Sequence, residues 1–208
     1  MKKKPPIKAV IFDLDGVLID ATEWHYDALN EALKVFGFEI QRSDHIGIYN
    51  GLPTAGKLKL LSEKHGLPEG LHAILKSLKR KYTDRKVNIH CAPSYEKQLL
   101  LTHLKKKYKL ACCSNAQKYS VVNMLKMAEI DHFFDEILGN DEGLPHKPHP
   151  DIYLEAFKRL KVSPEEVAIV EDAPHGIAAA KASGALVIEV KGYEDVNIDL
   201  FVKAGILS

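Results

Sequence analysis

The sequence predicts an α/β protein in which a doubly wound parallel sheet carries an inserted, all-helical domain. Two observations lead to this prediction. Five short apolar runs that indicate buried strands alternate, over most of the chain, with patterns typical of helices. The stretch between the first and second runs breaks the alternation, because about sixty extra residues there show only helical patterns.

The strands are expected where apolar and β-branched residues form short runs that end at a polar residue or a glycine. The first covers residues 8–13, in which Ala9-Val10-Ile11-Phe12 precedes Asp13. The other four are expected over residues 110–114, 136–139, 167–171 and 186–190. Helical patterns over residues 117–127, 150–160 and 174–182 lie between them. This alternation predicts one parallel sheet with helices on both faces.

The inserted domain is expected between residue 22 and about residue 86. It contains helical patterns over residues 23–36, 53–65 and 71–83. A crossover between two parallel strands needs one helix, and the pattern over residues 95–107 supplies it. We therefore predict an α/β core made of residues 1–21 and 87–208, and a helical domain made of residues 22–86.

The composition favours a soluble, cytoplasmic protein. Of the 208 residues, 46% are hydrophobic and 27% are charged, and a formal net charge of +1 gives no field that would attract nucleic acid or a membrane. The three cysteines are an odd number, and Cys112 and Cys113 are adjacent in an expected strand, which favours a reducing compartment over a disulfide framework. The first apolar run ends at Asp13, too early for a secretory signal, and no stretch is long enough to span a membrane. No pattern fixes the oligomeric state, and a monomer is expected.

Two acidic residues follow the first expected strand in the segment Asp13-Leu14-Asp15-Gly16. The glycine marks a turn, so both carboxylates stand at the carboxyl end of a buried strand, where open α/β sheets bind their ligands. There, one carboxylate can act as a nucleophile and metal ligand while its neighbour exchanges protons with a substrate. Acidic residues also end strands for structural reasons, so this segment alone leaves both interpretations open.

Three further motifs follow or lie between expected strands. They are Ala111-Cys112-Cys113-Ser114-Asn115, Lys147-Pro148-His149-Pro150-Asp151 and Val170-Glu171-Asp172-Ala173-Pro174. Together with the first acidic segment, and in this order, they resemble the haloacid dehalogenase superfamily, in its branch of aspartate-nucleophile phosphatases and β-phosphoglucomutase-like enzymes. The resemblance covers the chain from Lys8 to about Val190. It implies a Rossmann-like core, and it identifies the insertion as a helical cap domain.

The resemblance implies an enzyme that hydrolyses phosphate esters with the help of Mg²⁺. It makes Asp13 the nucleophile, which forms an aspartyl phosphate, and Asp15 the general acid and base. Asp13, the backbone carbonyl of Asp15 and Asp172 match the family's Mg²⁺ ligands, which are the hard oxygen donors that this ion prefers. Glu171 is expected to add a ligand, directly or through water; an acidic capping pair before a helix is the structural alternative for Glu171 and Asp172. The dehalogenase branch lacks an acidic residue at the position of Asp15, and the phosphonate-cleaving branch has a small one, so Asp15 points to phosphate-ester chemistry.

Four more residues of the core complete the expected site. Ser114 offers its hydroxyl, and Asn115 its backbone N–H, to phosphoryl oxygens. Gly16, in the turn beside the two carboxylates, is also predicted to bind substrate. Lys147 is predicted to be a fixed cation that pairs with the nucleophile and the transferred phosphoryl group. A solvated surface lysine is the structural alternative, and the Lys-Pro-His-Pro setting at the start of a helix favours the catalytic role.

Candidates for substrate selection lie in the expected cap. His25 matches a family position at the hinge of the cap, and a polar residue on an amphipathic helix is an equal alternative. Asn50, Gly51, Thr54 and Lys57 occupy the place of the family's substrate-specificity loop. The mutases carry an arginine at about the position of Thr54, where it grips the non-reacting phosphate. Lys57 is near enough to compensate, but in a different register.

The predicted function is therefore that of a cytoplasmic, Mg²⁺-dependent phosphatase of a small phosphorylated metabolite, such as a sugar phosphate. The missing arginine disfavours the nearest alternative, a phosphomutase of the β-phosphoglucomutase type. A catalytically silent binding protein of the same fold is the alternative from another class, and it is disfavoured because Asp13, Asp15, Lys147 and Asp172 are all present. The motifs handle only the phosphoryl group, so they leave open the substrate and the role of the basic run at residues 79–81.

Overall fold

The computed structural model describes residues 5–49 and 52–207, and it divides into two compact units. One unit contains the described residues of Met1–Asp20 and Cys91–Ser208, and the other contains those of Ala21–His90. The border that the sequence places after residue 86 lies inside a helix that continues to His90. Within the described residues, no helix is both long and apolar enough to cross a membrane.

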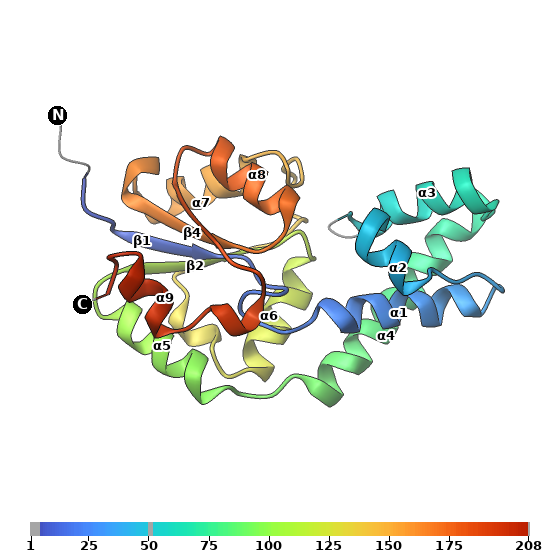
Figure 1. Cartoon of the computed structure of the whole chain (residues 1–208), viewed down its shortest axis with the longest axis horizontal. Helices are drawn as coiled ribbons and strands as arrows, with labels where there is room; N and C mark the ends of the chain where they lie inside the picture. Colours follow the sequence, from blue (N-terminus) through green and yellow to red (C-terminus); the bar gives the residue numbers. More distant parts are fainter. Residues whose placement is uncertain (1–4, 50–51, 208) are drawn as a thin grey trace. The chain divides into compact units, whose positions relative to one another are not determined.

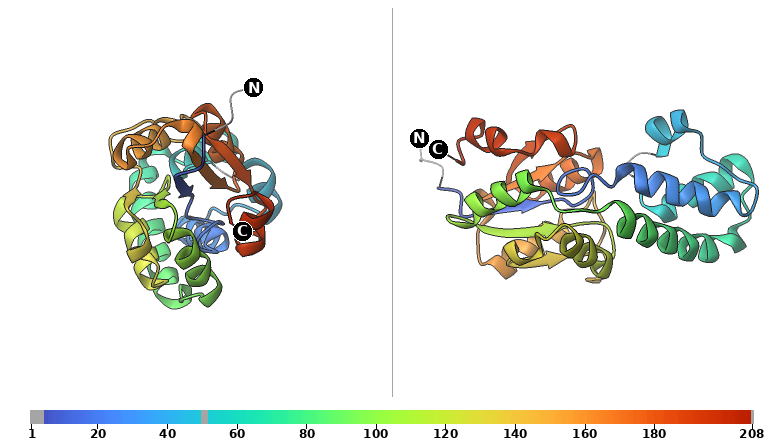
Figure 2. Two further views of the ribbon diagram at one scale, coloured as in Figure 1. Left: turned by 90° about the vertical axis from the view of Figure 1, so that its left-hand side faces the viewer. Right: turned by 90° about the horizontal axis from the view of Figure 1, so that it is seen from below.

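The first unit is built around a five-stranded sheet in which all strands are parallel. The strand order is β3-β2-β1-β4-β5, so the first strand of the chain lies at the centre. The strands are β1 (Ala9–Phe12), β2 (Lys109–Cys113), β3 (Glu136–Leu138), β4 (Val167–Glu171) and β5 (Leu186–Glu189). They lie side by side in the middle of this unit (Figure 2). The predicted doubly wound α/β fold is confirmed, with each strand within two residues of its expected ends.

Helices cover both faces of the sheet, as Figure 1 shows, with α7 and α8 on one side of the strands and α5 and α9 on the other. The helices of this unit are α5 (Tyr95–Lys105), α6 (Lys118–Met127), α7 (Asp151–Leu160), α8 (Pro174–Ala182) and α9 (Ile198–Lys203). Single turns of 3₁₀ helix join them at Asp131–Phe133, Pro164–Glu166 and Tyr193–Asp195. The helical pattern expected from residue 150 begins one residue later, and Pro150 occupies the N-cap position of α7.

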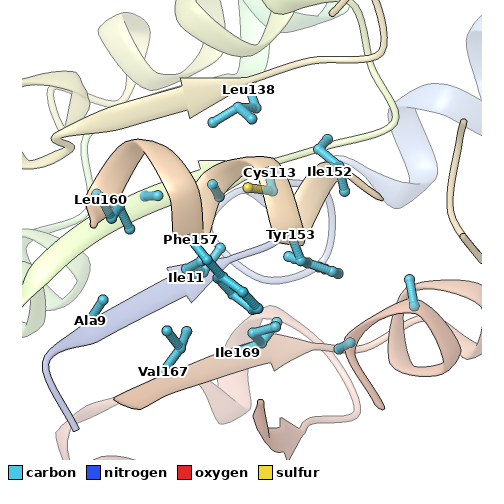
Figure 3. Packing of buried hydrophobic residues seen from close by; sticks show 14 residues of the cluster. Ala9, Ile11, Cys113, Leu138, Ile152, Tyr153, Phe157, Leu160, Val167 and Ile169 are labelled. Carbon is cyan, nitrogen blue, oxygen red and sulfur yellow. The ribbon is translucent and has the colours of Figure 1, made fainter. Parts of the chain in front are cut away.

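The core between α7 and the sheet is apolar and fully enclosed. Figure 3 shows Tyr153 and Phe157 of α7 over Ile11 of β1 and Ile169 of β4. The alternation of side chains along each strand sends Phe12 to the opposite face, where its ring meets the Phe201 ring of α9 at a centroid distance of 5.9 Å. Because both faces are covered, the central strand β1 is apolar and buried throughout, which is why the sequence showed it as a continuous apolar run.

Within the described residues of the second unit, all regular secondary structure is helical. It contains α1 (Thr22–Lys34), α2 (Arg42–Asp44), a π-helical turn at His45–Tyr49, α3 (Thr54–His65), a 3₁₀ turn at Glu69–Leu71 and α4 (His72–His90). The helices α1 and α4 run side by side (Figure 1), and they enclose a core that includes Leu29, Leu33, Leu58 and Leu75.

A buried amide fixes the chain where it leaves α1. The Asn30 side chain accepts from the N–H of Ile40 at 2.8 Å and donates to the carbonyl of Ile40 at 2.9 Å. Both backbone groups of one residue are thus paired inside the unit, as buried polar groups require. This clamp positions the segment that leads into α2 and the π-helical turn.

Candidate active site

The register of the sheet aligns the ends of three strands. Phe12 of β1 pairs with Cys112 of β2 on one side and with Val170 of β4 on the other. The residues that follow these positions therefore emerge at one edge of the sheet, which is where parallel α/β proteins bind ligands. Asp13 and Glu171 stand there, although they are far apart in the sequence.

Lys147 joins the two carboxylates at this edge. Its Nζ lies 2.7 Å from Oδ1 of Asp13 and 2.6 Å from Oε1 of Glu171, and it also donates to the carbonyl of Cys113 at 2.9 Å. Only 1% of the lysine side chain is exposed, so this is a buried charge cluster and not a surface ion pair. The peptide bond that follows, Lys147–Pro148, is cis.

The pKa values in the cluster are set by burial and by one ammonium, that of Lys147, which lies between two buried carboxylates. Burial lowers the pKa of Lys147, but Asp13 and Glu171 reverse this and the net direction is upward, so the lysine is charged. Burial raises the pKa of Asp13 well above its ordinary range; the Lys147 ammonium opposes this shift and Glu171 adds to it. Asp172 is half-buried, and burial together with Glu171 raises its pKa to about 6. The cluster thus holds three carboxyl groups, those of Asp13, Glu171 and Asp172, beside a single ammonium.

The carboxylates fit a divalent cation. Asp13, Glu171 and Asp172 each offer an oxygen atom, and these three atoms all lie within 4.8 Å of one another. Within the described part of the chain, Oε2 of Glu171 and Oδ1 of Asp172 are buried and have no hydrogen-bond partner. Leaving two buried carboxylate oxygens unpaired is costly, and a hard cation satisfies both.

The segment after β1 forms a compact turn that carries Asp15. Gly16 has a φ of +83°, which a residue with a side chain rarely adopts, and its N–H donates to the carbonyl of Ile19 at 2.7 Å. The carbonyl of Leu14 accepts from the N–H groups of both Leu18 and Ile19 at 2.9 Å. Asp15 is half-buried in this turn, next to the buried Leu14. The glycine expected to end the strand thus has a conformational role, while its predicted contact with substrate stays a prediction.

Ser114 and Asn115 follow β2 at the same edge. The Ser114 N–H donates to the carbonyl of Leu138 at 3.1 Å, and its Oγ accepts from the N–H of Ala116 at 3.0 Å. The side chain of Asn115 is engaged with the backbone of Lys147. The predicted phosphoryl contacts of the Ser114 hydroxyl and the Asn115 N–H stay predictions.

The remaining candidates belong to the helical unit. His25 Nδ1 of α1 lies 2.9 Å from Nζ of Lys79 in α4, so the histidine is part of a polar contact between these two helices. Thr54 is the first residue of α3, and Lys57 lies one turn later. Burial, with the like charge of Lys79, lowers the pKa of Lys57 to about 8. Asn50 and Gly51, the other two residues assigned to the specificity loop, lie outside the described residues.

Two residues of the site escaped the sequence analysis. The Tyr153 hydroxyl of α7 donates to Oε1 of Glu171. Gly176, in the first turn of α8, packs so closely that an added Cβ would lie 2.2 Å from the carboxyl group of Glu171. In the sequence, Tyr153 cannot be told from a core residue of an amphipathic helix. Gly176, two residues after Pro174, can be mistaken for a turn residue, but a glycine inside the first turn of a helix is unusual because Gly is a poor helix former, and this was the one signal available.

Comparison with known proteins decides the family. The sequence model of the family described as "Haloacid dehalogenase-like hydrolase" matches residues 10–190. The chain belongs to this family. It is 30% identical to the phosphoglycolate phosphatase of Aquifex aeolicus, over 92% of this chain and 88% of the relative. It is 28% identical to a phosphorylated carbohydrates phosphatase of Thermotoga maritima (86% of this chain and 82% of the relative), and 31% identical to the β-phosphoglucomutase of Bacillus subtilis (95% and 89%).

Solved structures show the same fold. The β-phosphoglucomutase of Clostridium difficile superposes with a TM-score of 0.79 at 22% identity, over 95% of this chain and 96% of that one. The predicted resemblance to the β-phosphoglucomutase and phosphatase branch is thereby confirmed, as is the prediction of an enzyme of the phosphatase type at the level of the family.

Proposed function

We propose that this protein is an Mg²⁺-dependent phosphatase that hydrolyses a small phosphorylated metabolite, such as a sugar phosphate, through an aspartyl phosphate on Asp13. One observation carries the proposal. Lys147 holds the Asp13 carboxylate at 2.7 Å inside a buried cluster whose other carboxylate oxygens converge on a place for a cation. A carboxylate that attacks an anionic phosphate is repelled by it, so the attack requires an ammonium and a metal cation close to the nucleophile.

The reaction runs in two steps on the residues of this chain. In the first, Asp13 attacks phosphorus, the bond to the leaving oxygen breaks, and Asp15 gives that oxygen its proton. In the second, Asp15 takes a proton from water, which attacks the phosphorus of the aspartyl phosphate and releases inorganic phosphate and free Asp13. Lys147 keeps Asp13 in place and offsets charge on the transferred group.

The proposed metal ligands are Asp13, Asp172, the backbone carbonyl of Asp15, and Glu171, directly or through water. Their fit to a hard cation rests on the two unpaired, buried carboxylate oxygens. When bound, Mg²⁺ neutralises phosphoryl oxygens so that a carboxylate can approach them. The substrate class follows the names of the relatives, which include a phosphoglycolate phosphatase and a phosphorylated carbohydrates phosphatase.

The helical unit is proposed to act as the cap that selects the substrate and shields the site from water, with Thr54 and Lys57 among its selecting residues. Its expected bounds were residues 22–86, and the compact unit is Ala21–His90. The cytoplasm remains the proposed compartment, which the three free, buried cysteines support. The monomeric state also remains a proposal.

A second candidate function is a phosphomutase, which the 31% identity to the β-phosphoglucomutase of Bacillus subtilis favours. A mutase needs a group that holds a second phosphate during turnover, and Thr54 stands at about the position of the mutase arginine. We therefore place the phosphatase first.

A screen of phosphorylated metabolites, read by phosphate release with Mg²⁺ and again with EDTA, tests the function. At least one substrate should release phosphate at a rate that EDTA abolishes, and Asp13→Asn should lose nearly all of that rate while keeping the parent's melting temperature within a few degrees. Asp199→Asn, at the exposed start of α9, is the matched control and should keep full activity. Isomerised substrate without phosphate release, seen by ³¹P NMR, would favour the mutase. Full turnover by Asp13→Asn would contradict both functions.

A further inference from the structure

The two oxygens of the Glu171 carboxylate have different surroundings. Oε1 accepts two hydrogen bonds, from Nζ of Lys147 at 2.6 Å and from the hydroxyl of Tyr153. Oε2 is buried and has no hydrogen-bond partner among the described residues. One end of the carboxylate is therefore fixed by donors, and the other end is left for a ligand.

Tyr153 touches both partners of this ion pair. It is fully buried in α7, with 0% of its surface exposed, and a buried phenol hydroxyl needs a hydrogen-bond partner. The hydroxyl finds that partner in Glu171, while the face of the ring lies 4.9 Å from Nζ of Lys147. Without the hydroxyl, Nζ of Lys147 would be the remaining donor to Oε1 among the described residues.

The backbone of Gly176 also packs against this carboxylate. A Cβ at this position would meet the carboxyl carbon and both oxygens of Glu171 at 2.2 Å, which is far inside van der Waals contact. The carboxylate is thus confined between a hydroxyl, an ammonium and bare backbone. This confinement sets the rotation of the carboxylate, and with it the direction in which Oε2 points.

We propose that Tyr153 is a positioning residue for the metal: it holds Oε1 of Glu171 so that Oε2 faces the cation shared with Asp13 and Asp172. The inference rests on the Mg²⁺ site of the proposed function and adds a residue that touches neither metal nor substrate. Carboxylates that bind metals are commonly fixed by hydrogen bonds to their outer oxygen, and loss of such a partner costs about 10- to 100-fold in metal affinity.

Calorimetric titration of the full-length protein with Mg²⁺ alone, without substrate, tests the inference. Tyr153→Phe should weaken the Mg²⁺ dissociation constant about tenfold, because the ring still fills the core but no longer fixes Oε1. Tyr108→Phe is the matched control. It also removes one hydroxyl hydrogen bond, to the carbonyl of Ile206 at 2.5 Å, in the same unit.

The Tyr108→Phe control separates an effect on the position of the Glu171 carboxylate from a general loss of protein stability. Both variants should melt below the parent in EDTA, because each loses a tyrosine hydrogen bond, but only Tyr153→Phe should change the Mg²⁺ affinity. Equal Mg²⁺ affinity in Tyr153→Phe and the parent overturns the inference and leaves the proposed phosphatase untouched. A parent that binds no Mg²⁺ in the titration overturns the inference and the metal dependence together.

Gly176→Ala gives a second route should Tyr153→Phe fail to fold. Its added methyl group displaces the Glu171 carboxylate directly, so Mg²⁺ affinity should fall at least as far as in Tyr153→Phe. Parent-like Mg²⁺ affinity in a folded Gly176→Ala would show that the position of this carboxylate does not govern the metal, and it would overturn the inference as well.

Discussion

Asn115 and Lys147 are joined through the side chain of one and the backbone of the other. The Lys147 N–H donates to Oδ1 of Asn115 at 3.1 Å, and Nδ2 of Asn115 reaches the carbonyl of Lys147 at 3.5 Å. This pair ties the loop after β2 to the segment before α7. The position of the lysine backbone, and therefore the reach of its ammonium, depends on a side chain 32 residues earlier.

Asn115→Ala should therefore lower kcat about tenfold, because the Lys147 ammonium loses its fixed position beside Asp13. Mg²⁺ affinity should fall as well, because the same ammonium donates to Oε1 of Glu171, a proposed metal ligand. Steady-state kinetics and metal titration measure the two quantities. Asn197→Ala is the control: it removes an asparagine that caps α9 by accepting from the Leu200 N–H at 3.1 Å, and it should cost about 1 kcal/mol of stability with no change in kcat. An unchanged kcat in Asn115→Ala contradicts the prediction.

Lys147→Met should destabilise the metal-free protein by roughly 3–5 kcal/mol, because Asp13 and Glu171 lose the cation that separates two buried carboxylates. Saturating Mg²⁺ should restore part of this loss, since it binds the same carboxylates. Denaturant unfolding with EDTA and with Mg²⁺ measures both values.

Lys97→Met provides the comparison for that experiment. Lys97 is also buried, but it donates to the carbonyls of Tyr193 and Val196 at 2.7 and 2.6 Å, away from the acidic cluster. Its loss should lower stability equally with and without Mg²⁺. If Mg²⁺ stabilises both lysine variants to the same degree, the metal does not act through the Lys147 cluster.

The stability of the protein should depend on pH through Lys57. Burial lowers the pKa of this lysine from 10.5 to about 8. Between pH 8 and pH 10.5 the unfolded chain binds a proton that the folded chain does not, so the free energy of unfolding rises with pH across this window. Below pH 8 the amine is charged in both states, and the full cost of burying the charge remains. Lys57→Met should thus be more stable than the parent by roughly 1–3 kcal/mol near pH 7, and the difference should shrink toward pH 10.

Denaturant unfolding of both proteins at the two pH values checks this. Lys59→Met, at an exposed lysine of the same helix, is the control and should show no such pH-dependent difference. A constant gap between Lys57→Met and the parent at both pH values would mean that the amine does not titrate in this window.

Substrate choice should respond to changes in α3. Thr54→Ala and Lys57→Met should change KM and the rank order of substrates more than they change Mg²⁺ affinity, because an interaction made equally in the ground and transition states appears in KM alone. Kinetics over the panel of phosphorylated metabolites, beside a metal titration, measure both effects. An unchanged rank order in both variants contradicts a selective role for these residues.

The sequence predicted the elements whose signals are local. The strands were visible because both faces of the sheet are covered, which makes runs such as Ala9–Phe12 apolar throughout. The acidic residues at their ends could be placed at one edge because parallel strands share it. Their convergence with Lys147 within 2.7 Å depends on the register between β1 and β4, which no local pattern contains.

The features that the sequence did not predict are set by tertiary contacts or have weak sequence signals. The short helix α2 and the π-helical turn His45–Tyr49 are three and five residues long, too short to show a helical period, and the clamp between Asn30 and Ile40 lies just before them in the chain. Tyr153 was indistinguishable from a core residue, since half of its role, the packing of its ring, is that of one. Its hydroxyl acquires a partner only when β4 is in place.

The central position of β1 has a consequence for biosynthesis. The nucleophile candidate is made early, but its lysine partner follows 134 residues later, a delay of roughly 7 to 27 seconds at ribosomal speeds of about 5–20 residues per second. Until β4 emerges and pairs with β1, the nascent chain carries Asp13 on a strand with an open edge, and this interval exposes it to mispairing. A chain stalled in this interval would therefore be catalytically inert and prone to aggregation, which makes the pairing of the late strand β4 the step that closes the open edge of β1 and completes the acidic cluster.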